Sequence, residues 1–213
     1  MTTLDQELED YIIRHIDPEE DVLYELNRHT HLKVIHPRMI SGHLQGKILR
    51  MLSFMVRPAF ILEIGTFTGY GSICLAQGLQ EGGQLHTIEH NDELAHIPGE
   101  YIRRMNLQDR ITLHVGDALT IIPQLDVMFD LVFIDAEKSQ YVEYYQLVME
   151  KIRPGGFILA DNILWSGKVL KQENANDHFT KGIKRFNDFV SQDERVEKVI
   201  LPIRDGLMIL RKK

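Results

Sequence analysis

The sequence predicts an α/β fold: a doubly wound, mostly parallel sheet of seven strands, with an antiparallel hairpin at its C-terminal end and a helical cap before it. Two observations carry this prediction. From residue 59 onward, short apolar runs bounded by turns alternate with longer amphipathic segments, as in a doubly wound sheet. The first 56 residues show instead the spacing of amphipathic helices.

The N-terminal segment, residues 3–56, is predicted to be helical. Apolar residues recur at the spacing of one helix face, Pro18 interrupts the pattern, and a further helix starts after Ser41, a suitable N-cap. The segment is too short and too helical to be a domain of its own. We therefore expect one domain over residues 1–213, in which this segment covers a core formed by 57–213.

Five short apolar runs are predicted as strands buried on both faces. They are Phe60–Ile64, Gln84–Ile88, Ile111–Val115, Leu131–Ile134 and Phe157–Ala160. The predicted helices among them are 71–80, 92–106, 117–124, 139–152 and 175–191. After these, Val196–Ile203 and Leu207–Arg211 flank Arg204-Asp205-Gly206, and an Asp-Gly turn between two apolar runs is typical of a hairpin.

Composition favours a soluble intracellular protein. The formal net charge of −7 is against a general nucleic-acid binder, which usually has a basic surface. The one cysteine, Cys74, allows no intrachain disulfide and favours a reducing compartment. The N-terminus lacks the features of a signal peptide, and no apolar stretch approaches the roughly 20 residues of a membrane helix. We expect a cytoplasmic protein with no membrane partner.

A glycine-rich loop follows the first predicted strand, at the edge where doubly wound sheets bind ligands. Its spacing is Gly65-x-x-x-Gly69-x-Gly71, which differs from the G-x-G-x-x-G of dinucleotide binders. Glu63 would repel phosphates but can pair with an amine. S-adenosylmethionine (SAM) carries an amine and a sulfonium and no phosphate, so it suits this loop. For Glu63 alone, a solvated acid at a strand end remains an alternative interpretation.

Two further acids follow the next two strands. Glu89 lies 24 residues after Gly65, near the offset of about 20 residues at which an acid accepts hydrogen bonds from ribose hydroxyls. Any nucleoside would satisfy that pattern. Asp117 is open to two compatible interpretations: it reads the edge of an adenine, or it caps the helix that follows.

Polar side chains also follow the fourth and fifth strands. Asp135 comes after one strand, and Asp161 and Asn162 come after the other. Carboxylate and amide oxygens without histidine or cysteine suit Mg²⁺, with Mn²⁺ or Ca²⁺ as alternatives. Two carboxylates converging in a cleft would repel each other without a cation. The alternative for each acid taken singly is a helix cap or a solvated side chain.

Together these residues resemble the cation-dependent O-methyltransferases, the family that includes catechol and caffeoyl-coenzyme A O-methyltransferases, from about residue 36 onward. The motifs that carry the resemblance are Met39-x-x-Gly42-x-x-x-Gly46, Leu62-Glu63-Ile64-Gly65-x-x-x-Gly69-Tyr70, Thr87-Ile88-Glu89, Phe133-Ile134-Asp135-Ala136-x-Lys138-x-x-Tyr141, Pro154-Gly155-Gly156 and Asp161-Asn162-Ile163-Leu164-Trp165. Many methyltransferases share the Glu-x-Gly loop. The combination of Asp135, Lys138 and Asp161-Asn162 is more specific.

The resemblance implies a Rossmann-like methyltransferase fold and a binding site for SAM. The cofactor-binding residues that it implies are Met39 near the sulfonium, Glu63 and the loop of Gly65 and Gly69 at the methionine part, Glu89 at the ribose, Asp117 and Ala118 at the adenine, and Asp135 close by. The family often has a serine directly after Gly-Tyr, but Gly71 stands there and Ser72 follows. Either Ser72 or backbone amides would take over that contact with the cofactor.

The resemblance also implies the metal ligands and the reaction. Asp135, Asp161 and Asn162 would bind Mg²⁺ (or Mn²⁺ or Ca²⁺), and Lys138 would stand beside the reacting hydroxyl of a small catechol-like substrate. If Lys138 is partly desolvated, its pKa falls and it accepts the hydroxyl proton. The alternative for Lys138 is a surface salt bridge to a neighbour such as Glu137. A homodimer is expected, because the family commonly forms dimers.

Three other functions compete with this hypothesis. The first is an O-methyltransferase acting on a hydroxylated uridine of tRNA, for which a local basic patch would suffice despite the acidic net charge. The second is a nicotinamide-dependent (NAD) oxidoreductase, which the glycine spacing and Glu63 disfavour. The third is a SAM-binding sensor without catalysis, which would need no metal ligands.

Overall fold

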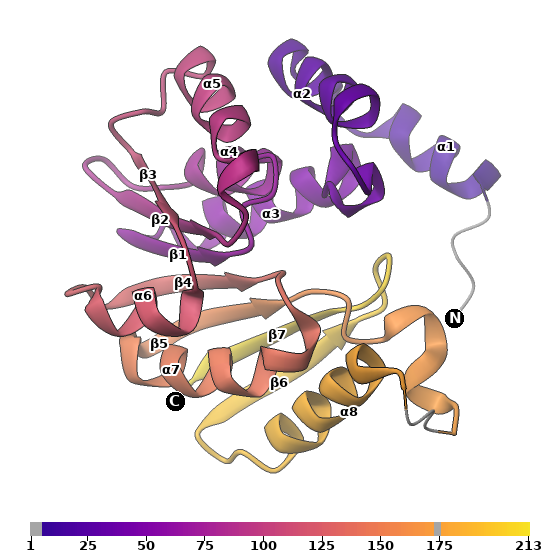
Figure 1. The fold of residues 1–213 in the computed structure, drawn as a ribbon, viewed down its shortest axis with the longest axis vertical. Helices are drawn as coiled ribbons and strands as arrows, with labels where there is room; N and C mark the ends of the chain where they lie inside the picture. The colour runs from indigo at the N-terminus through magenta and orange to yellow at the C-terminus, as the bar shows by residue number, and fades with distance from the viewer. Residues whose placement is uncertain (1–5, 173–175) are drawn as a thin grey trace.

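A mixed seven-stranded sheet in the order β3-β2-β1-β4-β5-β7-β6 forms the centre of the fold (Figure 1). The structure is a computed structural model that describes residues 6–172 and 176–213. The strands are β1 Phe60–Ile64, β2 Gln84–Glu89, β3 Ile111–Val115, β4 Phe129–Ile134, β5 Ile152–Ala160, β6 Val196–Leu201 and β7 Leu207–Lys212. Strands β1 to β5 pair in parallel, and β7 is antiparallel to β5 and β6. The predicted sheet with its hairpin is confirmed.

Helices cover both faces of the sheet. They are α1 Gln6–His15, α2 Asp21–Lys33, α3 Gly42–Val56, α4 Tyr70–Ala76, α5 His96–Arg104, α6 Ala118–Gln124, α7 Tyr141–Lys151 and α8 His178–Ser191, with short 3-10 turns η1 Pro37–Met39, η2 Asp92–Leu94, η3 Lys138–Gln140 and η4 Trp165–Leu170. Figure 1 shows α2 to α5 on one side of the sheet and α6 to α8 on the other. Residues 3–5 and 175, at the starts of two predicted helices, lie outside the described residues.

Alternate residues of each strand supply two separate cores, because successive side chains of a strand point to opposite faces. In β1, Ile61 packs with the α2–α5 layer and Leu62 packs with the α6–α8 layer, and neither is exposed. The N-terminal helices α2 and α3 contribute Leu26 and Leu49 to the first of these cores. By the same alternation, Glu63 points toward the α2–α5 side.

Strand β5 begins earlier than the sequence predicted, at Ile152 instead of Phe157. Ile152 pairs with Phe129 of β4, whereas the regular register resumes only at Phe157 opposite Leu131. The intervening residues form a bulge at Pro154-Gly155-Gly156, where Pro and Gly interrupt regular pairing. Pro154-Gly155-Gly156, which precede the predicted strand, are thus an irregularity within the observed one.

The N-terminal helices confirm the helical prediction for residues 6–56. Ser41 stands before α3 as expected, but the prediction that its side chain caps the helix is wrong. The residue is itself helical, with φ −57° and ψ −43°, and its side chain makes no capping hydrogen bond. Throughout the described residues, no helix has both the length and the apolar character needed to cross a bilayer.

Candidate active site

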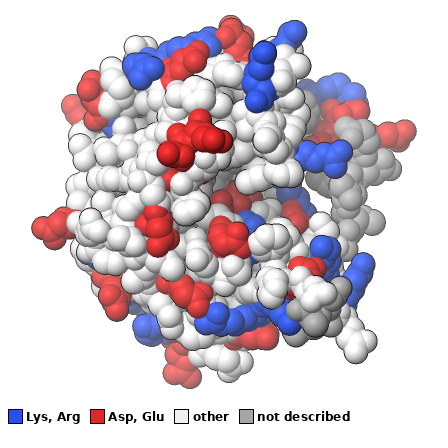
Figure 2. All heavy atoms as spheres, in the orientation of Figure 1, with Lys and Arg blue, Asp and Glu red and all other residues white. Residues whose placement is uncertain are grey.

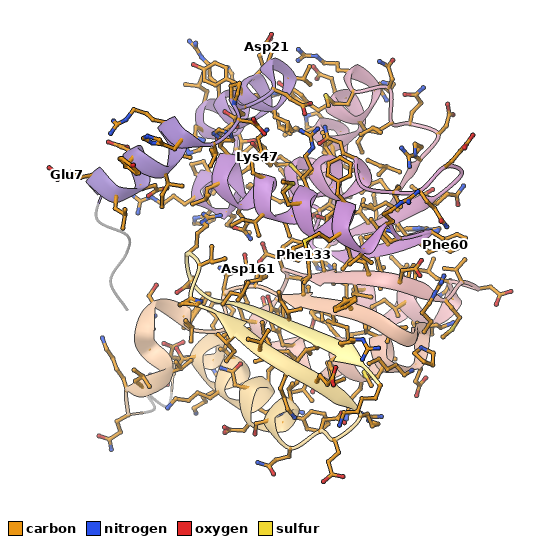
Figure 3. The ribbon with its side chains drawn as sticks, turned by 180° about the vertical axis from the view of Figure 1, so that it is seen from behind. Glu7, Asp21, Lys47, Phe60, Phe133 and Asp161 are labelled. Carbon is orange, nitrogen blue, oxygen red and sulfur yellow. The ribbon has the colours of Figure 1, made fainter. Side chains whose placement is uncertain are left out.

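The predicted site residues of β1, β4 and β5 meet at one edge of the sheet. The backbone N–H of Asp135 donates to Ile64 O of β1 at 2.9 Å, and that of Asp161 donates to Ile134 O of β4 at 3.0 Å. These two bonds continue the parallel ladders past the strand ends, so the acids and the glycine loop emerge side by side. Figure 3 labels Asp161 beside α3, the helix that carries Lys47. Figure 2 shows this molecule hollowed near the middle of one face, with acidic side chains in and around the hollow.

Asp161 is the most deeply buried of the three predicted metal ligands. It is 4% exposed, and its burial together with the charge of Asp135 raises the pKa of its carboxyl to about 6. The carboxylate accepts hydrogen bonds from Gln45 Nε2 at 2.5 Å and from the backbone N–H of Asn162. The two acids therefore lie in one partly buried region, where the charge of Asp135 disfavours the ionised form of Asp161.

Asn162 follows Asp161 in the left-handed region, with φ 60°, a conformation that asparagine adopts more readily than most residues. Within the described residues, no group of three or more His, Cys, Asp or Glu side chains could hold a metal ion. A cation site here therefore depends on the Asn162 amide as the third protein ligand. The donors are hard oxygens, the set that Mg²⁺, Mn²⁺ and Ca²⁺ prefer, so the residues present fit a divalent cation.

Lys138 is buried between the two acids. Its Nζ donates to Asp135 Oδ1 at 2.8 Å and to the Tyr141 hydroxyl at 2.6 Å. Burial by itself would lower the pKa of Lys138, but the charges of Asp135 and Asp161 and the neighbouring Tyr141 outweigh burial and raise the pKa above its ordinary value. The expectation of a lowered pKa for Lys138 is therefore wrong for the chain without a bound metal ion or substrate. The competing expectation was a surface salt bridge to a neighbour such as Glu137. A salt bridge to a neighbour is present, but the partner is Asp135 and Lys138 is buried.

Tyr141 ties this cluster to the sheet. Its side chain is fully buried, and its hydroxyl lies 3.2 Å from Ile134 O and 3.1 Å from Asp161 O. The ring also lies under the Lys138 ammonium, with Nζ 4.8 Å from the ring centroid. The lysine is thus held from several directions.

Glu63 forms a second buried acid on the side of the glycine loop. It is 1% exposed, and its Oε2 accepts hydrogen bonds from Thr87 Oγ1 at 2.6 Å and from Ser72 Oγ. Burial raises the pKa of its carboxyl to about 8, although these two bonds favour the ionised form. The interpretation of Glu63 as a solvated acid is wrong. A cationic amine beside it would offset the cost of ionising a buried carboxyl.

The glycine loop lies directly against the next strand end. Gly65 has φ 104°, and a Cβ there would meet Asp135 O at 2.0 Å, so glycine is needed for this approach. Gly69 has φ 90°, and a Cβ there would meet Pro98 at 2.8 Å. Gly71 faces Glu63, because a Cβ added at Gly71 would lie 2.6 Å from Glu63 Oε1. Ser72, the residue after it, turns its hydroxyl to the Glu63 carboxylate.

Glu89 at the end of β2 is held by the backbone around it. Its Oε2 accepts the N–H of Phe67 at 2.7 Å, and its Oε1 accepts the N–H of Asn91 at 2.9 Å. The side chain is 8% exposed. The first bond joins Glu89 to the glycine loop, so the predicted ribose-binding acid and the predicted methionine-binding loop form one structure.

The remaining predicted cofactor residues are Asp117, Ala118 and Met39. Asp117 accepts hydrogen bonds from Leu119 N at 3.1 Å and from Thr120 Oγ1 at 3.2 Å, so it is the N-cap of α6. This confirms one of its two interpretations and leaves the adenine contact a prediction. Ala118 is the first residue of α6 and is buried. Met39 ends η1 and is 60% exposed, and its place near a sulfonium also stays a prediction.

Two residues of the site were missed by the sequence analysis. Gln45 of α3 contacts Asp161, and Arg204 of the β6–β7 loop contacts Gln45. Gln45 lies directly before Gly46 of a family motif, which was the one available signal. Arg204 lies in the turn of the hairpin, and nothing in its local sequence connects it with a residue 159 positions away.

Comparisons with known proteins agree on one group of enzymes. A model of a family described as O-methyltransferase matches residues 14–213. The catechol O-methyltransferase of Niastella koreensis is 37% identical over 161 residues, which are 74% of this chain and 72% of that protein. Caffeoyl-CoA O-methyltransferase 1 of Eucalyptus globulus is 31% identical over 180 residues, 79% of this chain and 72% of that protein.

Solved structures give the same result for the fold. An O-methyltransferase from Bacillus cereus in complex with S-adenosylhomocysteine (SAH) is 30% identical and superposes with a TM-score of 0.91, covering 97% of each chain. An O-methyltransferase from Streptomyces achromogenes involved in tomaymycin synthesis, in complex with SAM, is 28% identical with a TM-score of 0.91 over 100% of each chain.

Proposed function

Because the chain belongs to the O-methyltransferase family, we propose that it transfers a methyl group from SAM to one of two neighbouring hydroxyls on a small catechol-like molecule, with a divalent cation. The observation that carries the proposal is the meeting of Asp135, Asp161 and Lys138 beside the Gly65 loop. Membership of this family sets aside the nicotinamide-dependent oxidoreductase hypothesis. A sensor without catalysis would have no use for a buried lysine held between two acids.

The donor would bind along the ends of β1, β2 and β3. Glu63 would pair with its amine, with Gly65 and Gly69 allowing the backbone to approach, and Glu89 would accept hydrogen bonds from the ribose. Support for the first role comes from the burial of Glu63, whose ionised form needs a cationic partner. Support for the second comes from Glu89, whose carboxylate is held in place by two backbone N–H groups.

The adenine and the sulfonium complete the donor site. Asp117 and Ala118 would meet the adenine at the start of α6, and Met39 would lie near the sulfonium. Asp117 and Met39 are both exposed and so free to contact a ligand, whereas Ala118 is buried. The chain's residues would thereby fix the methyl group over the acids of the metal site, and such positioning can lower a barrier by about 7–11 kcal/mol.

The cation would be held by Asp135, Asp161 and Asn162. When bound, it would supply a positive charge that lowers the pKa of a neighbouring substrate hydroxyl. Lys138 would first release its own proton to solvent, and its neutral Nζ would then accept the hydroxyl proton. The C–S bond of the donor would break as the new O–CH₃ bond forms, and SAH would leave. Lys138 gives up its own proton more readily once a dication offsets the charges of Asp135 and Asp161.

A substrate panel with and without Mg²⁺, read by release of SAH, tests this proposal. Catechols and their monohydroxyl analogues form the first arm, and labelled-methyl transfer into bulk tRNA forms the second. We expect transfer to catechols that is abolished by a chelator and restored by Mg²⁺ or Mn²⁺, and that is lost in Asp161→Ala with donor binding retained. Full activity of Asp161→Ala in a chelator would contradict the metal hypothesis. Methyl transfer into tRNA but not into catechols would show that the substrate is a tRNA and not a small catechol.

The N-terminal helices offer a surface for a homodimer. Several large apolar side chains are exposed there, among them Leu32, Ile35 and Met55, which are between 67% and 80% exposed, and exposed apolar side chains favour association. We infer that two copies pair through this surface. Sedimentation analysis of the wild-type chain and of Met55→Lys measures the effect, and a wild-type chain that sediments as a monomer at all concentrations would contradict it.

A further inference from the structure

Gln45 brings an N-terminal helix into contact with a predicted metal ligand. The residue lies on α3, is 5% exposed, and its Nε2 donates to Asp161 Oδ2 at 2.5 Å. The two residues are 116 positions apart in the sequence. A buried carboxylate that accepts a hydrogen bond from a buried amide has few alternative orientations, because either group would be left without a partner if it turned away.

Arg204 decides which end of the Gln45 amide faces Asp161. Its guanidinium donates to Gln45 Oε1 and to the carbonyl of Ser41, at the start of the same helix. An arginine has donors and no acceptor, so only the amide oxygen can face it. The amide nitrogen must then point to Asp161. The orientation of the amide follows from this chemistry and does not depend on telling its oxygen from its nitrogen.

The loop that carries Arg204 also holds the turn after Asn162. Ile163 N donates to Gly206 O at 3.1 Å, Leu164 N donates to Asp205 O at 2.9 Å, and Ser166 N donates to the Asp205 side chain. The β6–β7 loop thus hydrogen-bonds to the backbone of the segment after β5. Through Arg204 and Gln45 it is also linked to the carboxylate of Asp161, which precedes that segment. The same loop therefore restrains the segments on both sides of Asn162.

We propose that Gln45, oriented by Arg204, is a positioning residue that presents Asp161 to the divalent cation. The proposal rests on the proposed function, which supplies the cation. Gln45 donates a hydrogen bond to Oδ2 of Asp161 and so fixes the orientation of the Asp161 carboxylate. Partners of this kind orient metal ligands in many proteins, and their loss typically weakens metal affinity by about 10–100-fold.

The test measures the affinity of the purified chain for Mn²⁺ alone, by calorimetry and by the electron paramagnetic resonance signal of free Mn²⁺. Gln45→Met keeps the length of the side chain and removes both polar atoms. We expect its Kd for Mn²⁺ to rise about 10–100-fold, with donor affinity unchanged. The matched control is Gln77→Met, because Gln77 Nε2 also donates to a carboxylate, that of Glu20 at 3.1 Å, away from the site.

A second variant guards against misfolding of Gln45→Met. Arg204 is exposed, so Arg204→Met should fold, and we expect a smaller rise in the Kd for Mn²⁺, about threefold to tenfold if the amide is freed to turn. Its control is Arg110→Met, since Arg110 donates to two carbonyls, Leu79 O and Gln80 O, on another part of the surface. In the double variant of Gln45 and Arg204 the effects should not add, because both act through one hydrogen-bonded chain.

The outcomes separate this inference from the proposed function. If Asp161→Ala binds Mn²⁺ as the wild type does, the metal site itself is wrong. If Asp161→Ala loses Mn²⁺ while Gln45→Met and Arg204→Met keep the wild-type Kd, the metal site stands and the positioning role is overturned. Equal weakening in Gln77→Met would also overturn it, because the effect would then not belong to the contact with Asp161.

Discussion

Lys138 Nζ lies 2.8 Å from Asp135 Oδ1, and the two residues are only three positions apart. This pairing leaves Asp161 as the one carboxylate of the cluster without a cationic partner of its own. One ammonium against two carboxylates gives the cluster an excess negative charge at neutral pH, which a dication would more than neutralise. The pairing therefore explains why Asp135 tolerates its partial burial and why the two acids together would still attract a metal ion.

Replacing Lys138 by methionine should abolish most of the methyl transfer. A positioned proton acceptor typically contributes about 10²–10⁴-fold to a rate, so we expect kcat to fall in that range while the donor Kd stays unchanged. The measurement is SAH release at saturating substrate, with donor affinity from calorimetry. A fall in donor affinity of the same size as the fall in kcat would show instead that Lys138 serves the structure of the site.

Glu63 should make the stability of the donor-free chain depend on pH. The pKa of its carboxyl is raised from 4.5 to about 8 on folding. The folded state therefore binds a proton that the unfolded state has lost, and the stability that this group contributes is complete below pH 4.5 and is lost as the pH rises through about 8. We expect this group to lower the Tm as the pH rises from 4.5 to about 8, with no further fall from it above that pH, and Glu63→Gln to show a smaller fall over the same range.

Donor binding should act on the same carboxyl. An amine pairs with the ionised form, so at pH 7 binding of SAM should drive a proton off Glu63. Calorimetry in two buffers of different ionisation enthalpy measures this release, which we expect to be smaller in Glu63→Gln. Identical proton release from both proteins would mean that the amine binds elsewhere.

Gly71→Ala should weaken donor binding without unfolding the chain. A Cβ at this position would lie 2.6 Å from Glu63 Oε1, and Ser72 and Thr87 restrain that carboxylate from moving away. Losing a hydrogen bond to a charged group costs about 1.5–3 kcal/mol, which corresponds to a donor affinity about tenfold lower or weaker still.

Gly99→Ala is the control for that substitution. Gly99 also lies within a helix, α5, but its Cβ would meet only Arg103 Nη1 at 3.6 Å, an ordinary contact. There we expect an increase in stability of about 0.5–1 kcal/mol, because alanine favours helix more than glycine does, and no change in donor affinity. A similar donor Kd for both variants would contradict the placement of Glu63 in the donor site.

Asp117 allows its two roles to be separated. Asp117→Ala removes the cap of α6 and should lower stability by about 1 kcal/mol, whereas Asp117→Ser keeps a capping hydroxyl and should change stability by a few tenths. If the carboxylate also reads the adenine, both variants lose donor affinity. Donor binding that is normal in Asp117→Ser would limit the residue to its capping role.

Much of the fold was predictable because it follows local patterns. The apolar runs gave the positions of β1 and β3 to the residue, and the Asp-Gly turn gave the hairpin. The early start of β5 was not predictable, because the pairing of Ile152 with Phe129 across a bulge depends on the neighbouring strand and not on local sequence. Ser41 met the local rule for a cap, yet its carbonyl serves Arg204 instead.

The site was predictable only where strand ends carry the chemistry. Parallel strands bring their carboxyl ends to one edge, so Glu63, Asp135 and Asp161 could be expected to lie near one another. The raised pKa of Lys138 could not be foreseen, because it is set by which acids surround the ammonium and how closely. Gln45 and Arg204 could not be foreseen either, since both reach the site from distant parts of the chain.

The contacts among Gln45, Asp161 and Arg204 join residues 116 and 159 positions apart. Closing loops of that length costs conformational entropy before any local contact compensates for it, so pairings of this kind form late during folding. The geometry that would bind a cation accordingly depends on segments that are far apart in the sequence having come together. Mn²⁺ uptake during refolding would therefore report when these distant segments have met.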